Sequence, residues 1–326
     1  MHRMRMTVLV PFDNELLAVY NANKDEIAPM SPDRLPGIRA DDADGVPQGD
    51  ELSRDGRFTV TERSVPGLPG SPEIPLLICT PVGVPGPRPT IYYTHGGGMF
   101  CGDHRLDLDW LLDTAERFGA TLVSVGYRLA PEHPHPAPID DVYAGLLWTA
   151  DHAAELGLDP ERIVAAGTSA GGGLTAALAL TVRDKGGPRL LGQLLMCPML
   201  DDRNDSASLW QMDGRDVWDR SWNGFGWDAL LGSVRGGPDV PQYAAPARAA
   251  DLSGLPPAFI DLGSAESLRD EGLAYANRIW QAGGEAELHV WAGGCHVFDA
   301  LVPDARISRA AREARHSWLD RLLATG

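Results

Sequence analysis

The sequence predicts an α/β protein whose mainly parallel central sheet is covered by helices on both faces. From residue 90 onward, short apolar runs alternate with longer segments of helical character. The runs are continuously apolar rather than alternating with polar residues, which is typical of strands that are buried on both faces of a parallel sheet. The regular succession of strands and helices along the chain favours the same architecture.

Six apolar runs are expected to form the parallel strands. They are "TIYYTH" (90–95), "TLVSVGY" (121–127), "RIVAAG" (162–167), "LLGQLLMC" (190–197), "PAFIDLG" (257–263) and "AELHVW" (286–291). Helices are expected between them, for example over 138–156, which opens with Pro138, and over 269–284, which ends in two glycines. The alternating run 57–65 and the run 74–80 are expected to be neighbouring strands.

Two segments depart from this pattern. Residues 1–55 are polar, acidic and interrupted by proline and glycine, so we expect an arm or part of a cap rather than an independent core. Residues 203–235 are expected to form a helical insertion above the sheet, which would serve as a cap on a single domain over 56–326. This insertion contains four tryptophans, Trp210, Trp218, Trp222 and Trp227. We expect at least one of them to line a cleft, because aromatic walls are typical of ligand sites.

Composition excludes several classes of function. The 326 residues carry a formal net charge of −17, and so acidic a surface repels phosphate backbones, so no nucleic-acid partner is expected. The four cysteines are scattered and are expected to be reduced thiols. No apolar run approaches the ~18 residues of a membrane span. Pro11 and Asp13 interrupt the N-terminal run that superficially resembles a signal peptide, so a cytoplasmic protein is expected.

The stretch "GTSAGGG" (167–173) lies between a predicted strand and a predicted helix. Its spacing fits neither a P-loop, which needs a lysine after the last glycine, nor the dinucleotide fingerprint G-x-G-x-x-G. It fits G-x-S-x-G, in which a serine occupies a tight strand-to-helix turn between small residues. We therefore interpret Ser169 as a nucleophile. The alternative is a glycine turn that allows close packing of the helix on the sheet.

The stretch "HGGG" (95–98) follows the strand at 90–95. Three consecutive glycines destabilise regular structure and leave backbone N–H groups accessible. An oxyanion hole needs such N–H groups, because they stabilise the negative charge that develops during acyl transfer. The alternative is a point where two chain segments cross closely.

A glycine-rich loop after the last predicted strand contains His296, in "AGGCHVFD". Serine, then acid, then histidine is the chain order of an α/β-hydrolase. His289 is expected to pack against the sheet within its own strand. His133 and His135 are not expected to bind a metal.

The acid partner is expected among four carboxylates, Asp261, Glu266, Asp270 and Glu271. Asp261 lies within an apolar run, before the end of its strand. Ser267 and Asp270 match the capping-box pattern S-x-x-[DE], which would give Asp270 a structural task at a helix N-terminus. Glu271 would lie further along the same helix. Glu266 remains in the loop between strand and helix, so it is predicted to be the acid, with Asp270 as the runner-up.

These motifs resemble those of the bacterial hormone-sensitive-lipase-like esterases, also called family IV. The matching stretches are "HGGG" (95–98), "YRLAPEHP" (127–134), "GTSAGGG" (167–173), "SLRDE" (267–271) and "GGCHVF" (293–298), in the family's order. The resemblance implies an α/β-hydrolase fold with a helical cap, and an oxyanion hole formed by Gly97, Gly98 and the N–H of Ala170. It also implies catalysis without a cofactor or metal, and members of the family often form a homodimer through an edge strand, although the sequence leaves the oligomeric state open.

The sequence departs from the family's pattern at three positions. Thr168 stands in the elbow where aspartate is more frequent, which resembles a subgroup with a GTSAG elbow. Glu266 replaces the usual aspartate of the triad, and it occupies the same position in the motif. Val297 replaces the glycine after the histidine, which could alter packing beside His296.

The sequence therefore predicts a serine carboxylesterase acting on short- to medium-chain esters of small molecules. Ser169 would attack the acyl carbonyl, His296 would transfer the proton, and Glu266 would orient the imidazole. One alternative is a serine hydrolase of a natural-product lactone, ester or amide. Another is a non-catalytic ligand-binding protein, because a fold does not fix a function. All three triad residues are present, which favours an enzyme.

Overall fold

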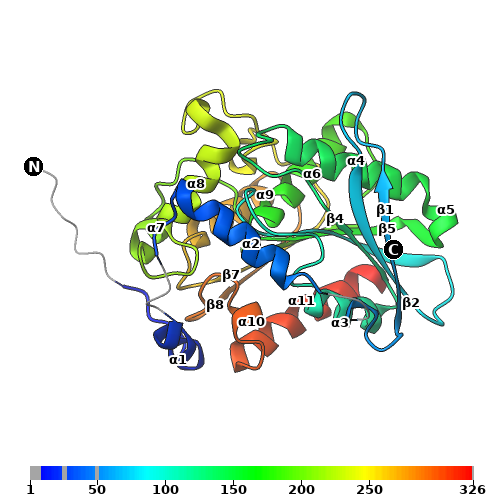
Figure 1. Cartoon of the computed structure of the whole chain (residues 1–326), viewed down its shortest axis with the longest axis horizontal. Coiled ribbons are helices and arrows are strands. Elements are labelled where there is room, and N and C mark those ends of the chain that lie inside the picture. Colours follow the sequence, from blue (N-terminus) through cyan, green and yellow to red (C-terminus); the bar gives the residue numbers. More distant parts are fainter. Residues whose placement is uncertain (1–8, 24–27, 48–50, 325–326) are drawn as a thin grey trace, which may run out of the picture.

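An eight-stranded sheet forms the centre of the molecule in the computed structural model, which describes residues 9–23, 28–47 and 51–324 (Figure 1). The strands are β1 (Phe58–Val65), β2 (Ile74–Pro81), β3 (Arg88–Thr94), β4 (Thr121–Val125), β5 (Leu158–Thr168), β6 (Gly192–Met196), β7 (Ala258–Gly263) and β8 (Ala286–Trp291). Their order across the sheet is β1-β2-β4-β3-β5-β6-β7-β8. The strands β1 and β2 pair antiparallel, as do β2 and β4, and every other pair is parallel. The predicted α/β architecture is confirmed.

The helices lie between and around the strands. They are α1 (Asn14–Asn23), α2 (Leu35–Gly45), α3 (Asp109–Phe118), α4 (Ala137–Asp151), α5 (Ala153–Leu156), α6 (Ala170–Lys185), α7 (Ala207–Met212), α8 (Arg220–Leu231), α9 (Arg269–Gln281), α10 (Phe298–Leu301) and α11 (Arg306–Ala324). Short 3₁₀ turns are η2 (Pro32–Arg34), η3 (Glu51–Ser53), η4 (Gly232–Val234) and η5 (Pro246–Arg248). Among the described residues, no helix is both long enough and apolar enough to cross a membrane.

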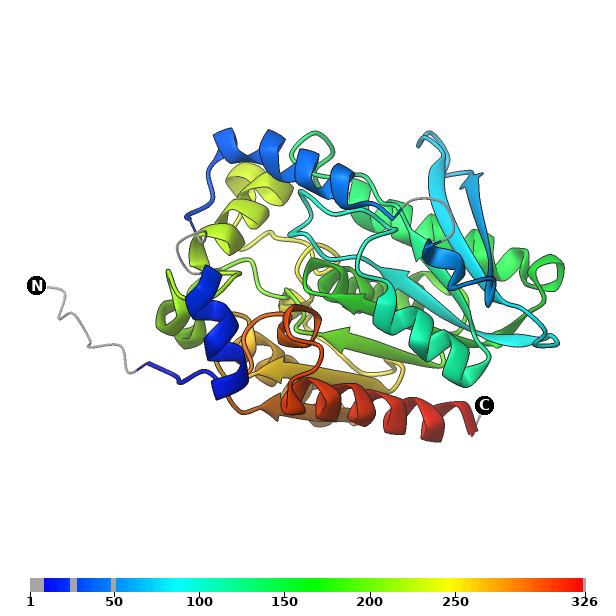
Figure 2. The same cartoon turned by 60° about the horizontal axis from the view of Figure 1, so that its bottom comes forward.

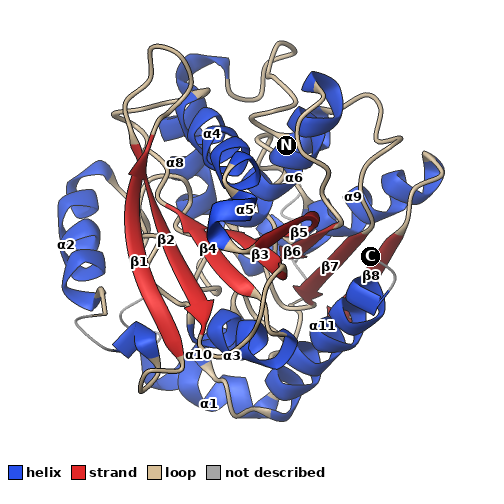
Figure 3. Ribbon diagram, turned by 90° about the vertical axis from the view of Figure 1, so that its right-hand side faces the viewer, coloured by secondary structure: helices blue, strands red, loops and turns tan. Residues whose placement is uncertain are grey.

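Each face of the sheet has its own hydrophobic core, because successive side chains of a strand point to opposite faces. In β3, Tyr92 packs into the core beneath α4, α6 and α9, whereas Ile91 and Tyr93 pack into the core beneath α3 and α11. Figure 3 shows these two helical layers on opposite sides of the sheet. Strands buried in this way must be apolar throughout, which explains the continuous apolar runs in the sequence.

The predicted helix over 138–156 is divided in the structure. The helix α4 ends at Asp151, His152 adopts a non-helical conformation, and α5 adds one further turn. The ring of His152 stacks on Trp148, and its Nδ1 lies 2.9 Å from the carbonyl oxygen of Trp148. A side chain that bonds to the carbonyl four residues earlier competes with the backbone of the helix, and here the helix is interrupted.

The N-terminal segment and the insertion meet beside the edge of the sheet where the parallel strands end. Figure 2 shows α1 (dark blue) and α8 (yellow-green) on the side to which the strand arrowheads point. The indole N–H of Trp222 in α8 donates to the carbonyl of Ala28 at 3.1 Å, and the N–H of Met30 donates to the hydroxyl of Ser221 at 3.1 Å. Two segments that are far apart in the sequence are therefore held together at this edge.

A buried ion triad fixes α11 against the sheet. The guanidinium of Arg315 lies 2.8 Å from Asp261 in β7 and 2.5 Å from Asp299 in α10, and its side chain is only 3% exposed. Burial raises the pKa of Asp261, while Arg315 opposes that shift. The position of Asp261 within an apolar strand is therefore tolerated because a cation from α11 neutralises it.

Replacing Arg315 with leucine is expected to lower the free energy of unfolding by about 3–5 kcal/mol, because two carboxylates lose their buried cation. Urea denaturation followed by circular dichroism measures this loss. Arg189→Leu is the matched control, because Arg189 forms an ion pair with Glu161 in which both side chains are about two-thirds exposed. An equal effect of the two substitutions would contradict a structural role for the buried triad.

Candidate active site

Ser169 occupies a strained turn between β5 and α6. Its backbone has φ 57° and ψ −119°, a conformation that side chains other than glycine rarely adopt. The turn is held from the neighbouring strand, because the N–H of Ser169 donates to the carbonyl of Met196 at 2.8 Å and its carbonyl accepts from Met199 at 2.9 Å. The surroundings therefore impose the strain and project the hydroxyl from the edge of the sheet.

The two glycines of G-x-S-x-G are required by close backbone contacts. A Cβ on Gly167 would lie 2.2 Å from the carbonyl oxygen of Gly171. A Cβ on Gly171 would lie 2.0 Å from the carbonyl oxygen of Thr94, at the end of β3. These contacts bring the serine turn against the start of the "HGGG" loop, as the parallel pairing of Thr94 with Gly167 requires.

His296 reaches Ser169 from the loop that follows β8. Its Nε2 lies 2.9 Å from the hydroxyl oxygen of Ser169, and both side chains are buried. Burial lowers the pKa of His296 to about 4, although the nearby Asp216 opposes that shift. The imidazole is therefore neutral near pH 7, which is the form that can accept a proton from a serine hydroxyl.

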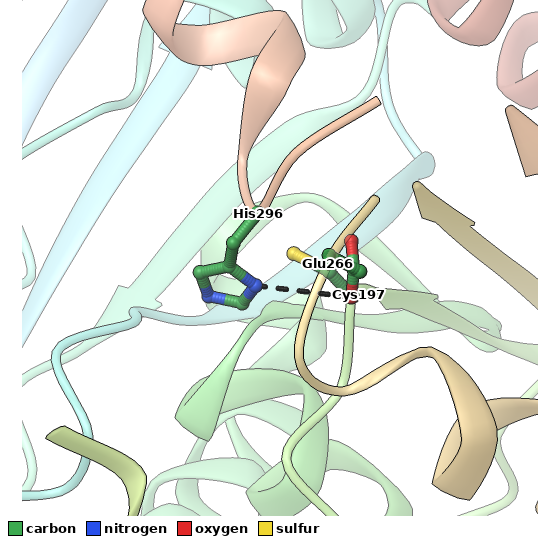
Figure 4. Close-up of side chains that lie close together, drawn as sticks. All are labelled: Cys197, Glu266 and His296. Carbon is green, nitrogen blue, oxygen red and sulfur yellow. Dashed lines mark ion pairs between the residues drawn. The ribbon is translucent and has the colours of Figure 1, made fainter. Parts of the chain in front are cut away.

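Glu266 faces the other side of the imidazole, as Figure 4 shows. Its Oε1 lies 3.8 Å from Nδ1 of His296, and neither atom has a hydrogen-bond partner among the described residues. Its Oε2 accepts from the N–H of Gly263 at 2.9 Å. Burial raises the pKa of Glu266 well above its usual range. Burial thus disfavours an isolated charge on either group, and a hydrogen bond from Nδ1–H would offset that cost for the carboxylate.

The other predicted acid candidates have partners elsewhere. Asp261 pairs with Arg315, and Glu271 accepts from the N–H of Leu200 at 2.6 Å. Asp270 accepts from the N–H of Ser208 in α7 at 2.8 Å. The structure brings only Glu266, of the four, within ion-pair distance of His296.

The predicted capping box at Ser267 and Asp270 is wrong. The N-cap position of α9 is Leu268, which has no side-chain cap, and the hydroxyl of Ser267 has no partner among the described residues. Asp270 instead binds α7 of the insertion, and the hydroxyl of Ser208 accepts the N–H of Asp270 at 3.2 Å. A tertiary contact with the insertion therefore replaces the local cap.

The three predicted oxyanion donors belong to the two loops that meet at Ser169. Gly97 and Gly98 have φ values of 99° and 60°. Glycine adopts such positive φ values without the steric strain that a side chain would cause. Within the described ranges, the N–H groups of Gly97, Gly98 and Ala170 donate no hydrogen bond to another protein group. Tyr127 supports this loop, because its hydroxyl donates to the carbonyls of His95 and Gly96. The donors are thus fixed in place and remain free for a ligand.

A cavity of about 480 Å³ opens at Ser169 and His296. Trp218 of the insertion lines it, and a Cβ on Gly98 would lie 2.2 Å from the ring of Trp218. The other three tryptophans are placed differently: Trp210 is half exposed, Trp222 packs on Phe100, and Trp227 is fully buried. One of the four predicted candidates therefore lines the cavity.

One group of side chains in the described part of the chain has the spacing of metal ligands, and Figure 4 shows it. The ligand atoms of Cys197, Glu266 and His296 lie within 4.8 Å of one another. Burial and the nearby Glu266 raise the pKa of the Cys197 thiol well above its usual range. A cysteine binds a metal as its thiolate, and the raised pKa keeps the Cys197 thiol protonated. This set of donors is therefore poorly suited to a metal.

Sequence reasoning missed Asp216. This residue lies in the turn between α7 and α8, is fully buried, and accepts hydrogen bonds from the backbone N–H groups of His296 and Ser267. No local pattern distinguishes it from the other aspartates of the insertion. Its environment depends on how the insertion folds over the loops that carry Glu266 and His296.

The family model for the alpha/beta hydrolase fold matches residues 91–300, a range that contains the serine turn, both glycine-rich loops and the acid. The chain belongs to this family. Carboxylesterase NlhH of Mycobacterium tuberculosis is 42% identical over 250 residues, which are 70% of this chain and 72% of that protein. Esterase LipI of the same species is 36% identical over 256 residues, which are 70% of this chain and 76% of that protein.

A solved structure of a bacterial heroin esterase is similar throughout. It is 36% identical, has a TM-score of 0.88, and the match covers 96% of this chain and 98% of that chain. Together these relatives confirm the predicted resemblance to hormone-sensitive-lipase-like esterases at the level of the family. The protein is a carboxylic ester hydrolase.

Proposed function

We propose that the protein hydrolyses short- to medium-chain carboxylic esters through the triad Ser169, His296 and Glu266. The observation that carries this proposal is the 2.9 Å contact between the hydroxyl of Ser169 and Nε2 of His296 at a strained turn that opens into a cavity. Nucleophile and base are within hydrogen-bond reach, as acyl transfer requires. The carboxylate of Glu266 faces the remaining ring nitrogen.

The reaction proceeds in two halves. His296 accepts the proton of Ser169 while the serine oxygen attacks the acyl carbonyl, and it then donates that proton to the leaving alcohol. Water, activated by the same imidazole, hydrolyses the acyl-enzyme and releases the acid. Glu266 holds the ring with its Nδ1–H toward the carboxylate and stabilises the imidazolium.

The developing oxyanion is bound by the N–H groups of Gly97, Gly98 and Ala170. Each such donor typically contributes about 3 kcal/mol to the stability of the transition state. The positive end of the α6 dipole at Ala170 favours the same negative charge.

Residues 1–55 and the insertion 203–235 together form the cap of a catalytic domain that spans 56–326. Their mutual hydrogen bonds, and the position of Trp218 in the cavity wall, support this division. Thr168 in the elbow supports the proposal that the chain is a member of the GTSAG subgroup. A cytoplasmic location and a homodimer formed through an edge strand complete the proposal.

Ser169→Ala is expected to abolish ester hydrolysis and covalent labelling by a fluorophosphonate, because the Cys197 thiol beside His296 is buried and its pKa is raised well above the usual range. Labelling is read by mass spectrometry, and hydrolysis with p-nitrophenyl esters of graded acyl length. An unchanged melting temperature would show that the fold is intact. Persistent labelling of the variant would refute the assignment of the nucleophile.

Glu266→Gln is expected to lower kcat by about 10³- to 10⁴-fold, because the imidazole loses the charge that orients it. Asp270→Asn is the matched control. It loses a hydrogen bond to α7, which is expected to cost about 1 kcal/mol of stability with little change in kcat. The acid is misassigned if the larger kinetic loss belongs to Asp270→Asn.

Trp218→Ala is expected to enlarge the cavity and to raise the rate with long acyl chains relative to acetate by about tenfold or more. Relative kcat/KM values across a series of p-nitrophenyl esters provide the measurement. Trp210→Ala is the control, because its half-exposed side chain lies outside the cavity. A series that is unchanged in Trp218→Ala would exclude this residue from acyl selection.

A further inference from the structure

Asp216 connects the insertion to both loops that carry the remaining triad residues. Its Oδ1 accepts from the backbone N–H of His296 at 3.1 Å, and its Oδ2 accepts from the N–H of Ser267, next to Glu266, at 3.1 Å. Oδ1 also accepts from the N–H of Val217 at 2.9 Å. One carboxylate of the insertion therefore spans the acid loop after β7 and the histidine loop after β8.

The carboxylate is fully buried, and N–H groups rather than a cation satisfy it. No arginine or lysine forms an ion pair with it in the described part of the chain. The titratable groups that face it are His296 and Cys295 from the histidine loop and Glu266 from the acid loop. Burial, together with Glu266, raises the pKa of Asp216 to about 7, while His296 and the N–H donors oppose that shift.

The same turn forms part of the cavity wall. Val217 and Trp218, which follow Asp216 directly, both line the cavity at Ser169. The N–H of Asp216 donates to the carbonyl of Met212 at the end of α7, so the carboxylate is anchored within the insertion. A displacement of this wall would therefore be transmitted to the backbone of His296.

We propose that Asp216 is a positioning residue, through which the insertion holds the loops of His296 and Glu266 in register with Ser169 and adds a second negative charge near the imidazole. This role rests on the proposed triad. The backbone hydrogen bonds fix where the imidazole lies, and the charge favours the imidazolium that forms when Ser169 attacks.

A purely structural role predicts a different outcome, and Asp219 provides the comparison. Asp219 lies in the same turn, is also buried, and accepts from the N–H groups of Gly214, Ser221 and Trp222. All of these donors belong to the insertion itself. Asp219→Asn therefore disturbs the insertion to a similar extent without touching either triad loop.

The experiment compares Asp216→Asn with Asp219→Asn in the full-length protein. An asparagine at 216 can still accept one of the two loop N–H groups, but its amide nitrogen opposes the other. We expect kcat to fall by about tenfold or more, the factor that corresponds to one pKa unit of lost interaction, with a smaller change in KM.

The pH profile of kcat/KM is the second measurement, because a purely structural role of Asp216 would leave the position of its acidic limb unchanged. Its acidic limb marks proton uptake by His296 and the carboxylates that face it. Asp216, with a pKa of about 7, takes up a proton before His296, whose pKa is about 4, so removing this carboxylate means that a lower pH is needed to protonate the site. We expect the limb of Asp216→Asn to move to lower pH by about one unit. The limb of Asp219→Asn should coincide with that of the wild type, even if its melting temperature falls.

The proposal is overturned if the limb of Asp216→Asn does not move, or if its loss of kcat is no larger than that of Asp219→Asn. Should Asp216→Asn fail to fold, Asp216→Glu serves instead. It keeps the charge but displaces it by one methylene, so kcat should fall while the limb stays in place, and wild-type kcat would overturn the proposal. Full activity of Ser169→Ala would instead refute the triad itself, so the two failures are distinguishable.

Discussion

The strained backbone of Ser169 is the constraint on which the rest of the site depends. A positive φ at a serine persists only where the surroundings fix it, and here Met196 of β6 accepts from its N–H while Met199, in the loop after β6, donates to its carbonyl. The absence of a Cβ at Gly171 allows the first turn of α6 to touch the end of β3. That contact places the "HGGG" loop beside the serine, so nucleophile and oxyanion donors follow from one close approach of backbones.

The second requirement of the site is that carboxylates can be buried near the carboxyl ends of the parallel strands. The buried carboxylates include Asp216, Asp261, Glu266 and Glu271. Backbone N–H groups occupy both oxygens of Asp216 and one oxygen each of Glu266 and Glu271, and Arg315 neutralises Asp261. A carboxylate whose two oxygens are both occupied cannot accept a hydrogen bond from Nδ1 of His296. Glu266 differs because Gly263 occupies one oxygen and leaves the other free to face His296.

Much of this could be predicted from local patterns. The continuous apolar runs, the serine turn and the chain order of Ser169, Glu266 and His296 each depend on a few neighbouring residues, and they predicted the fold and the residues that the structure brings together. The capping box at Ser267 and Asp270 failed because its partner, Ser208, comes from the insertion. Asp216 was missed for the same reason. Contacts between segments distant in the sequence leave no local periodicity to detect.

The insertion therefore does more than cover the sheet. Asp216, Val217 and Trp218 are consecutive. Asp216 accepts hydrogen bonds from both triad loops, and Val217 and Trp218 form part of the cavity wall. A change of cap sequence that reshapes the wall must also move the carboxylate that holds His296, because three adjacent residues cannot be displaced independently. Acyl selectivity and the geometry of the base are then linked through the backbone. In this fold, selection for a new substrate would act on the rate of the chemical step as well as on the shape of the cavity.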